Sequence, residues 1–410
     1  MAGDSLITGI DIGTTKVSTV IAECEPGRVP KIIGVGLGRS EGVKRGAVVN
    51  VEKTVEAVAR SVEEAERMAG AKVDNAYVGI AGGHIQGVLS TAVIAVSRSD
   101  DEITKEDLSR VLEQAQAISI PSDRRVLHVL PIEFAVDDQD GIRNPIGMSG
   151  VRLEAAVHII TAAATSARNV EKCVRRAELE VKELVFESYA AGFSVLEEEE
   201  KELGVLLIDL GGGTTDLTVY LGGSIRYTGT VGLGGENVTS DIAIGLRTPL
   251  SEAEELKTRH GHAIASRVSS EREIEIPGIG GRPDRVISHQ VLCSIIESRM
   301  EEILELTTRE ARKTEILDLL GGGVVLTGGS AQLPGVAEMA EAVLEMPVKV
   351  GAPFRVGGLV DEVSSSRFAT AVGLVQYGWE REGRNVRRLN GRGNGVDRIR
   401  NKLRAFVDRF

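Results

Sequence analysis

Two similar turns, each directly after a predicted strand, constrain the fold of this chain more than any other feature. Residues 6–10 run into DIGTTKV, and residues 205–208 run into DLGGGTTDL about half a chain later. A repeated strand-turn-strand unit indicates a duplicated domain, in which each half presents its own turn to a shared cleft. We therefore predict an α/β protein built from two related halves.

Composition excludes several classes of function. The 410 residues exceed what one hydrophobic core accommodates, so we expect more than one domain. A formal net charge of -12 disfavours nucleic acid as a partner, because an acidic surface repels phosphates. The three cysteines lack the spacing of a zinc site or a disulfide framework. There is no secretory signal and no apolar run long enough to span a bilayer, so we expect contact with a membrane only at its surface.

The chain between and after the two turns predicts further subdomains. A Thr104/Asp107 capping box, a Ser251/Glu254 capping box and a long helix over residues 286–313 mark elements outside the two halves. Residues 381–395, rich in Arg, Gly and Asn, predict a flexible linker. We assign the first half to 1–83 and 162–200, an inserted β-α-β-β subdomain to 84–161, the second half to 204–245 and 313–380, and a small second-half subdomain to 246–312.

The residues of the two turns suit a nucleotide and its metal. Asp11 and Asp209 end strands, where a carboxylate can hold a hydrated Mg²⁺. Glycines let backbone N–H groups approach phosphate oxygens, and hydroxyls and a lysine add donors. A third glycine turn precedes a predicted helix and suits a ribose or α-phosphate. One such turn alone is more typical of an ordinary hairpin, but the combination predicts a nucleotide site made by Gly13, Thr14, Thr15, Lys16, Gly212, Gly213, Thr214, Gly328, Gly329 and Ser330.

The carboxyl-terminal residues 396–410 predict an amphipathic helix. One face is apolar and the other carries five basic residues against two acidic ones, a balance that suits an anionic membrane surface. The alternative is a helix that docks on its own domain. The residues expected to contact the membrane are Val396, Ile399, Arg400, Leu403, Arg404, Phe406, Val407 and Phe410.

These motifs resemble those of the actin, sugar-kinase and heat-shock-chaperone superfamily and, within it, those of the FtsA family of bacterial cell-division proteins. DIGTTKV is similar to the first phosphate loop, ESYAAG to the first connecting segment and DLGGGTTDL to the second phosphate loop. VVLTGGSAQLPG resembles the adenosine motif and ATAVGL the second connecting segment. The resemblance extends over essentially the whole chain and implies a duplicated actin-like, ribonuclease H-like ATPase fold with an inserted subdomain.

The resemblance also implies roles for particular residues. It places Asp11 and Asp209 at Mg²⁺ and the glycine and threonine turns at the phosphates of ATP. Glu187 would face the water near the γ-phosphate, although a plain helix-end carboxylate is an equal alternative. Lys257 would reach the nucleoside, with a solvated helix lysine as its alternative. The group expected at the ribose and adenine is Gly235, Glu236, Glu254 and Lys257.

For partners, the resemblance implies FtsZ, further copies of the same chain, the membrane and other division proteins. The tail of FtsZ would dock on the small second-half subdomain, where Arg285 and Arg299 are candidates; their alternative is pairing with nearby glutamates. The implied function is an ATP-binding protein with at most slow hydrolysis, which polymerises and tethers FtsZ to the cytoplasmic face of the membrane at the division septum. A pilus-assembly scaffold, a small-molecule kinase and a chaperone-type ATPase are the alternatives on the same fold.

Overall fold

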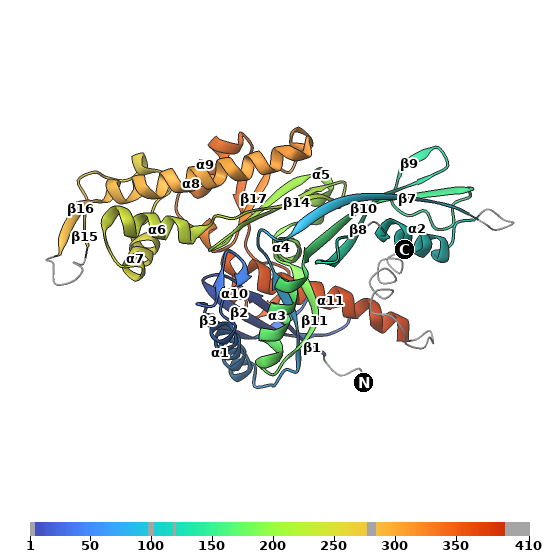
Figure 1. Ribbon diagram of the computed structural model, residues 1–410, viewed down its shortest axis with the longest axis horizontal. Coiled ribbons are helices and arrows are strands. Elements are labelled where there is room, and N and C mark those ends of the chain that lie inside the picture. Colours follow the sequence, from blue (N-terminus) through green and yellow to red (C-terminus); the bar gives the residue numbers. More distant parts are fainter. Residues whose placement is uncertain (1–4, 97–101, 118–119, 277–283, 390–410) are drawn as a thin grey trace.

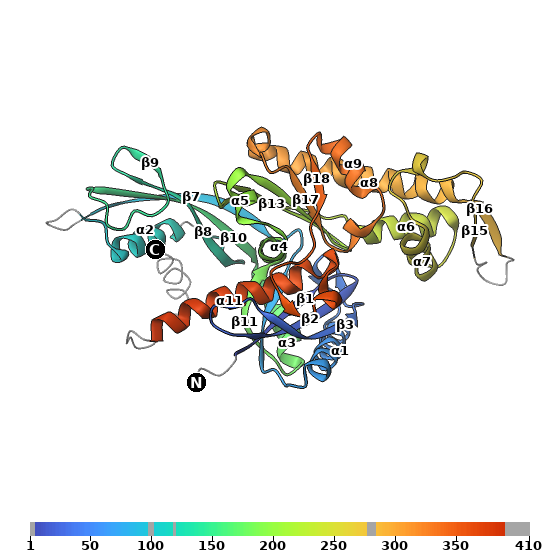
Figure 2. The ribbon, with the colours of Figure 1, turned by 180° about the vertical axis from the view of Figure 1, so that it is seen from behind.

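Two sheet-based halves meet at the centre of the molecule, and one smaller subdomain projects from each of them (Figure 1). The computed structural model describes residues 5–96, 102–117, 120–276 and 284–389. The view from behind places the long carboxyl-terminal helix α11 across the first half, below the sheet of the second (Figure 2).

The first half contains a six-stranded sheet in the order β11-β6-β1-β2-β3-β19. β1 and β2 form an antiparallel hairpin, and β6 joins β1 in parallel on its other side. Helices α1 and α3 pack against the sheet through a shared apolar core. The elements are β1 (Ser5–Ile12), β2 (Lys16–Cys24), β3 (Lys31–Arg39), β4 (Val43–Lys44), β5 (Ala47–Val48), α1 (Val51–Ala69), β6 (Asn75–Ile80), α3 (Ala164–Arg176), β11 (Glu180–Phe186) and β19 (Gly357–Gly358).

The second half repeats this topology in a five-stranded sheet ordered β14-β13-β12-β17-β18. β12 and β13 form the hairpin, and β17 joins β12 in parallel as β6 joins β1. This repetition confirms the predicted duplicated α/β fold. The elements are α5 (Glu198–Leu203), β12 (Val205–Leu210), β13 (Thr215–Leu221), β14 (Ser224–Val231), β17 (Val324–Thr327), α9 (Val336–Leu344) and β18 (Val348–Val350). The short helix α10 (Val360–Val363) follows in the chain but packs on the first half through Val363.

A separate four-stranded sheet, β7-β10-β8-β9, interrupts the first half and packs on α2. The Thr104/Asp107 capping box at the start of α2 is confirmed, because each residue's side chain bonds the other's backbone N–H. The sheet also reaches β14 of the second half, where His158 Nε2 and Thr228 Oγ1 share a hydrogen bond of 3.0 Å. The elements are β7 (Gln86–Ala95), α2 (Lys105–Gln116), β8 (Arg124–Val136), β9 (Gln139–Ile142) and β10 (Arg152–Ala163).

The small subdomain of the second half corrects two predictions. Its elements are α6 (Gly235–Leu246), α7 (Leu250–His260), β15 (Glu273–Ile276), β16 (Arg285–Ser288) and α8 (His289–Ala311). The predicted Ser251/Glu254 capping box is wrong. α7 already begins at Leu250, so its N-cap is Pro249, and no side chain caps this helix end. The long helix does not begin at residue 286, because the β-branched Val286 and Ile287 pair with β15 instead.

Two helices connect the halves. α4 (Glu187–Val195) and α11 (Ala369–Leu389) cross so closely that a Cβ on Gly373 would lie 1.9 Å from the Ala190 carbonyl oxygen. Only glycine permits this approach, so the two backbones touch where the halves join.

The carboxyl-terminal end of α11 corrects the predicted linker. Residues 381–389 of the 381–395 segment are helical, because Arg381 anchors this turn. Its Nε donates to the Tyr377 hydroxyl at 2.9 Å, and its guanidinium lies 3.5 Å from Glu183. The predicted membrane-binding residues 396–410 lie outside the described residues. Within the described part of the chain, no helix combines the length and the apolar character needed to cross a bilayer.

Candidate functional site

Four carboxylates gather where the two halves face each other. Asp11 lies near the end of β1, and Glu187 begins α4. Asp209 on β12 lies directly opposite Asp216 on β13, so each strand of the second hairpin contributes one carboxylate. The structure thus brings together the three predicted acidic residues and adds Asp216.

Burial, together with neighbouring negative charges at Asp209 and Glu187, raises the pKa values of three of these carboxylates. Burial, followed by the charges of Asp216 and Asp11, raises the pKa of Asp209 to about 7. Burial raises the pKa of Asp216 to about 6. Burial and the neighbouring aspartates, Asp11 first, raise the pKa of Glu187 well above its usual value. The site therefore disfavours full ionisation and would gain stability from a bound cation.

Few groups of the protein offset this negative charge. Lys16 is the basic residue among the carboxylates, with its Nζ 3.3 Å from Asp11 Oδ2. Thr370 donates to Asp209 at 3.1 Å, and Thr214 donates to Asp216 at 2.9 Å. Carboxylate oxygens suit Mg²⁺. Among the described residues no three His, Cys, Asp or Glu side chains are placed to hold a metal ion by themselves.

The glycines of the second turn lie against the threonines of the first. A Cβ on Gly212 would lie 2.7 Å from Thr15 Cγ2, and one on Gly213 would lie 2.5 Å from Thr14 Oγ1. A Cβ on Gly13 would lie 3.0 Å from the carbonyl oxygen of Lys16. Side chains at Gly212 and Gly213 would push the two turns apart, so glycine at these two positions lets the halves approach each other.

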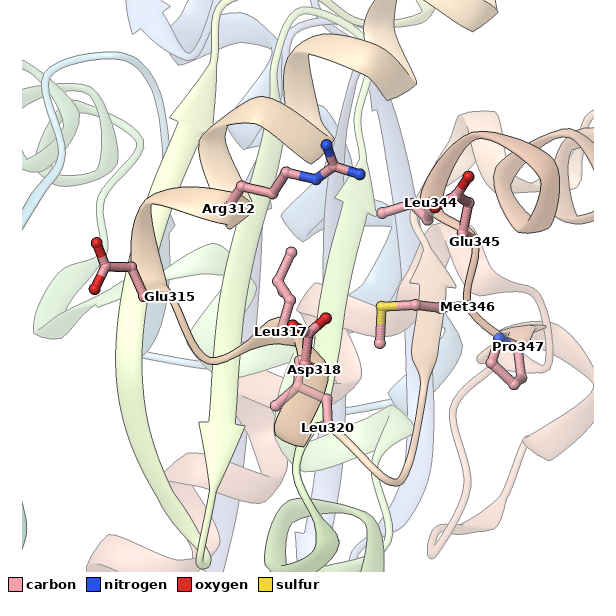
Figure 3. Close-up of a pocket in the computed structure, with 9 residues that line it drawn as sticks. All are labelled: Arg312, Glu315, Leu317, Asp318, Leu320, Leu344, Glu345, Met346 and Pro347. Atoms are coloured by element: carbon pink, nitrogen blue, oxygen red, sulfur yellow. The ribbon is translucent and has the colours of Figure 1, made fainter.

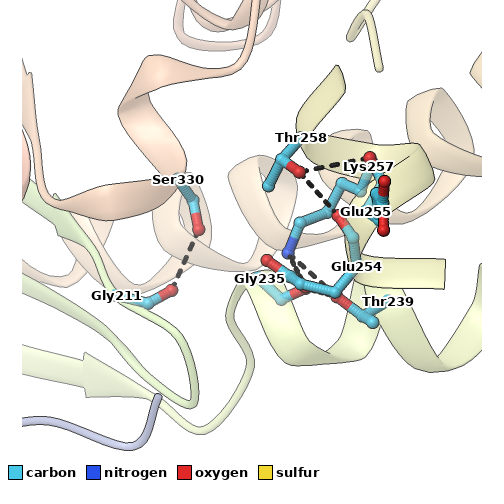
Figure 4. A network of polar contacts seen from close by, with 8 residues as sticks. All are labelled: Gly211, Gly235, Thr239, Glu254, Glu255, Lys257, Thr258 and Ser330. Carbon is cyan, nitrogen blue, oxygen red and sulfur yellow. Dashed lines mark hydrogen bonds and ion pairs between the residues drawn. The ribbon is translucent and has the colours of Figure 1, made fainter. Parts of the chain in front are cut away.

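A polar network on the other side of the second turn joins the residues expected at the nucleoside (Figure 4). Lys257 Nζ donates to the Gly235 carbonyl oxygen at 3.1 Å and to Thr239 Oγ1 at 2.9 Å, and lies 2.7 Å from Glu254 Oε2. With 16% of its side chain exposed, Lys257 is not the solvated lysine of the alternative reading. Burial and then Glu254 raise the pKa of Glu236, while Lys257 and Lys44 oppose the rise.

The third glycine turn completes the site. Ser330 Oγ donates to the Gly211 carbonyl oxygen at 3.1 Å and so links the second and third turns (Figure 4). Gly328 has a φ of 89°, and a Cβ there would lie 2.3 Å from Asp209 Oδ1. Gly329, by contrast, faces open space. All three turns therefore line one region between the halves.

The side chain of Glu187 packs against a glycine of the first-half sheet. A Cβ on Gly79 of β6 would lie 2.9 Å from Glu187 Cγ, so the glycine leaves room for the carboxylate. The residue as a whole is half-buried, and its carboxylate is buried beside the aspartates. This placement argues against a plain helix-end carboxylate that faces bulk solvent.

The two candidate partner residues lie on different elements. Arg285 is exposed on β16. Arg299 lies on α8, where it pairs with Asp241 and Glu302. Pairing of Arg299 within the subdomain, the alternative weighed from the sequence, is therefore what the structure shows. A pocket of about 640 Å³ near the ends of α8 and α9 is lined by none of the predicted site residues (Figure 3).

The acidic cluster predicts an unusual dependence of stability on pH. Because the pKa of Asp209 is higher in the folded than in the unfolded chain, the folded protein binds more protons between about pH 4 and pH 7. Its contribution to the free energy of unfolding is therefore present at low pH and is lost as pH rises. Relative to an Asp209→Asn variant, the nucleotide-free protein should lose stability from pH 5 to pH 8 by up to about 1.4 kcal/mol per pH unit. Thermal unfolding of both proteins across this range tests it; a constant difference would contradict the raised pKa.

Two family models match the chain. The model described as "Cell division protein FtsA" matches residues 206–373, and "SHS2 domain inserted in FTSA" matches residues 82–161. The cell division protein FtsA of Pseudomonas aeruginosa is 44% identical over 377 residues, which cover 92% of this chain and 90% of that protein. The FtsA of Escherichia coli K12 is 39% identical over 412 residues, which cover 99% and 96%.

Solved structures share the fold at low sequence identity. A type IV pilus biogenesis complex, PilM-PilN, aligns with a TM-score of 0.62 at 18% identity, over 91% of this chain and 98% of that one. MreB5 of Spiroplasma citri bound to ADP aligns with a TM-score of 0.55 at 14% identity, over 93% and 98%. These likenesses confirm the predicted actin-like architecture.

Proposed function

This chain belongs to the FtsA family of cell division proteins, and we propose that it acts there as an ATP-dependent scaffold that polymerises and anchors FtsZ filaments to the cytoplasmic face of the membrane. The observation that carries the proposal is the convergence of three glycine turns and four carboxylates between two matched halves. Such a site suits a nucleotide whose bound state alters how the halves meet.

The donor set supports Mg-ATP as the ligand. Asp11 and Asp209 would hold the hydrated Mg²⁺, and the threonines and Lys16 would contact the phosphates. Glu187 would orient water near the terminal phosphate. Glu236, Glu254 and Lys257 would contact the ribose and adenine, with Gly235 and residues 328–330 beneath them. The bound ion would neutralise the crowded carboxylates, so nucleotide and metal should bind together.

The scaffold role rests on two parts of the chain, the carboxyl-terminal segment and the small second-half subdomain. Residues 396–410 would bind anionic lipid through an apolar face and arginines, and a single helix of this length binds weakly. Polymerisation would join many weak anchors into a strong one by avidity. FtsZ would dock on the small second-half subdomain, with exposed Arg285 as a contact and Arg299 available only if it releases its own partners. Other division proteins and a septal location follow as proposals from the same role.

Family membership bears on the alternatives. The FtsA relatives are 39% to 44% identical over nearly the whole chain, whereas the pilus-assembly structure shares 18% identity and thus only the fold. A kinase would require an acceptor molecule, and acceptor-dependent ATP consumption would reveal one.

Cosedimentation with anionic liposomes, with and without ATP and FtsZ, tests the proposed function. We expect the chain to pellet with liposomes and to carry FtsZ into the pellet, more so with Mg-ATP than without nucleotide. Liposomes of neutral lipid serve as the control. FtsZ that stays in the supernatant while this chain pellets would contradict the tethering role and leave the membrane role intact.

A further inference from the structure

The outer face of α3 carries a row of basic residues that the proposed nucleotide site does not use. Arg168, Lys172 and Arg175 are exposed, and their spacing of four and then three residues places them on one stripe of the helix. The opposite stripe, which includes Val170 and Val174, is buried in the core of the first half. The basic stripe therefore points away from the molecule, and it is about 10 Å long.

The neighbouring acidic residues are already bound by other arginines. Arg176 donates two hydrogen bonds of 2.7 Å to Glu52, and Arg125 Nη1 lies 2.7 Å from Glu171 Oε1. Within the part of the chain that the structure describes, none of the three stripe residues forms an ion pair. Their charges are thus available to an anion outside the molecule.

Stabilisation of the helix does not account for the whole stripe. Arg175 lies in the last turn of α3, where a cation interacts favourably with the helix dipole. Arg168 lies in the amino-terminal half of the helix, where the dipole gives a cation no such benefit. α1, which packs into the same core, carries five acidic and three basic residues, whereas α3 carries one acidic and four basic residues. The positive charge of α3 is therefore a local feature of an acidic chain.

The position of α3 favours a membrane as the anionic partner. α3 and α11 pack into separate cores of the first half, and α11 passes behind α3 (Figure 1). Only six residues, 390–395, separate the end of α11 from the predicted membrane-binding residues 396–410. Fully extended, six residues span up to about 20 Å. The membrane-binding residues are therefore not confined to the side of the first half on which α11 lies.

Charge supports the same partner. An anionic bilayer repels a chain whose net charge is -12, so the protein would approach it with a face on which positive charge gathers. One short amphipathic helix binds a membrane weakly, and stable anchoring combines such a weak anchor with a basic patch. An acidic protein segment is the alternative partner. However, α3 lines neither the pocket near α8 and α9 nor the pocket between β8 and α4, in which a peptide could be enclosed.

We propose that the stripe of Arg168, Lys172 and Arg175 is a second membrane contact, which binds anionic lipid headgroups while residues 396–410 bind through their apolar face. The proposal rests on the proposed membrane anchor and adds an orientation to it. The first half faces the bilayer. The small subdomain on which FtsZ would dock belongs to the other half, which faces away from the lipid.

Replacement of all three stripe residues by glutamine tests this contact in the full-length protein. The triple variant Arg168→Gln, Lys172→Gln, Arg175→Gln should need about tenfold more lipid for half-maximal binding to vesicles of phosphatidylglycerol and phosphatidylcholine, because each basic residue near an anionic surface adds to the affinity. High salt should remove the difference between this variant and the wild type, since it screens exposed charges. Cosedimentation over a range of lipid concentrations measures both effects.

The matched control removes the same charge from the second half. Arg272, Arg309 and Arg312 are exposed there, and the triple variant Arg272→Gln, Arg309→Gln, Arg312→Gln should stay within about twofold of the wild type, because charges far from the bilayer are screened. A general effect of net charge on binding would change both triple variants equally and would contradict a specific contact through α3.

A fluorescent label measures the orientation directly. The three native cysteines are buried, so a new cysteine at exposed Asn169 of α3 or at exposed Ser298 of α8 can be labelled selectively. Spin-labelled lipid headgroups should quench a probe on Asn169→Cys strongly and a probe on Ser298→Cys weakly. Equal quenching of the two probes, or stronger quenching on α8, would overturn the orientation.

The outcomes separate this contact from the anchor on which it depends. Wild-type protein that stays in solution with anionic vesicles would refute the anchor itself. Wild-type binding with the same lipid requirement in the stripe variant would refute the contact through α3 alone. Unchanged vesicle binding together with lost FtsZ binding would assign the stripe to an acidic protein surface and so overturn the proposal. Lys172→Glu, a single charge reversal at the centre of the stripe, decides the matter if thermal unfolding shows that the triple variant is not folded.

Discussion

Replacement of Asp209 by asparagine should weaken Mg²⁺-dependent ATP binding by about 100-fold and raise the unfolding temperature of the nucleotide-free protein by about 2–4 °C. The two effects have one cause. Asp209 is buried beside Asp216 and Asp11, which raises its pKa to about 7. A neutral amide of the same shape removes this repulsion and with it the charge that would hold the cation. Thr370, which donates to Asp209 at 3.1 Å, can donate equally to the amide oxygen.

Asp361→Asn is the matched control, because Asp361 is exposed on α10 and far in sequence from the loops. Titration with ATP in the presence and absence of Mg²⁺, together with thermal unfolding, gives both quantities. Wild-type affinity in Asp209→Asn would refute the site assignment. A lower unfolding temperature would show instead that the carboxylate stabilises the empty site.

Removal of residues 396–410 should release the protein from anionic liposomes almost completely, with ATP affinity unchanged. The sequence of the segment predicts an apolar helix face and carries a net positive charge, on a chain whose total charge is -12, and both would favour an anionic bilayer. The described part of the chain offers no spanning helix as a substitute. Sedimentation with vesicles of mixed anionic and neutral lipid measures the bound fraction.

A second variant separates apolar from electrostatic binding. Leu403→Asn with Phe406→Asn keeps every charge of the segment while removing apolar area, and should also release the protein. Raising the salt concentration should weaken the wild-type interaction, because screening affects only the charges. If the truncated chain pelleted as well as the full-length one, the segment would not be the anchor.

The fold was predictable because its strongest signal is local and repeated. Asp11 and Asp209 precede similar turns, and the repetition required them to face each other across one cleft. Asp216 was missed although it belongs to the second motif, because only the hairpin register reveals that it lies opposite Asp209. The close approach of the β4–β5 turn to Gly213 was also missed, since it joins residues more than 160 positions apart.

Errors in the sequence interpretation arose where tertiary contacts override local preference. Helical spacing extended the long helix to residue 286, but Val286 and Ile287 complete a two-stranded sheet. Composition predicted a linker from residue 381, but a guanidinium bound to Tyr377 and Glu183 continues α11 through that point. In both cases, a partner distant in sequence decides the conformation.

The inserted subdomain contacts the second half separately from the helices that connect the halves. Ser224 donates to the Ile132 carbonyl oxygen at 3.1 Å, and Arg226 lies 3.2 Å from Glu133. The crossing of α4 and α11 at Gly373 is a further place where the halves are joined. Each of these contacts limits how the second half can turn against the first. A wide opening of the cleft would therefore have to break the hydrogen bonds and the ion pair of the inserted subdomain as well as bend the connecting helices.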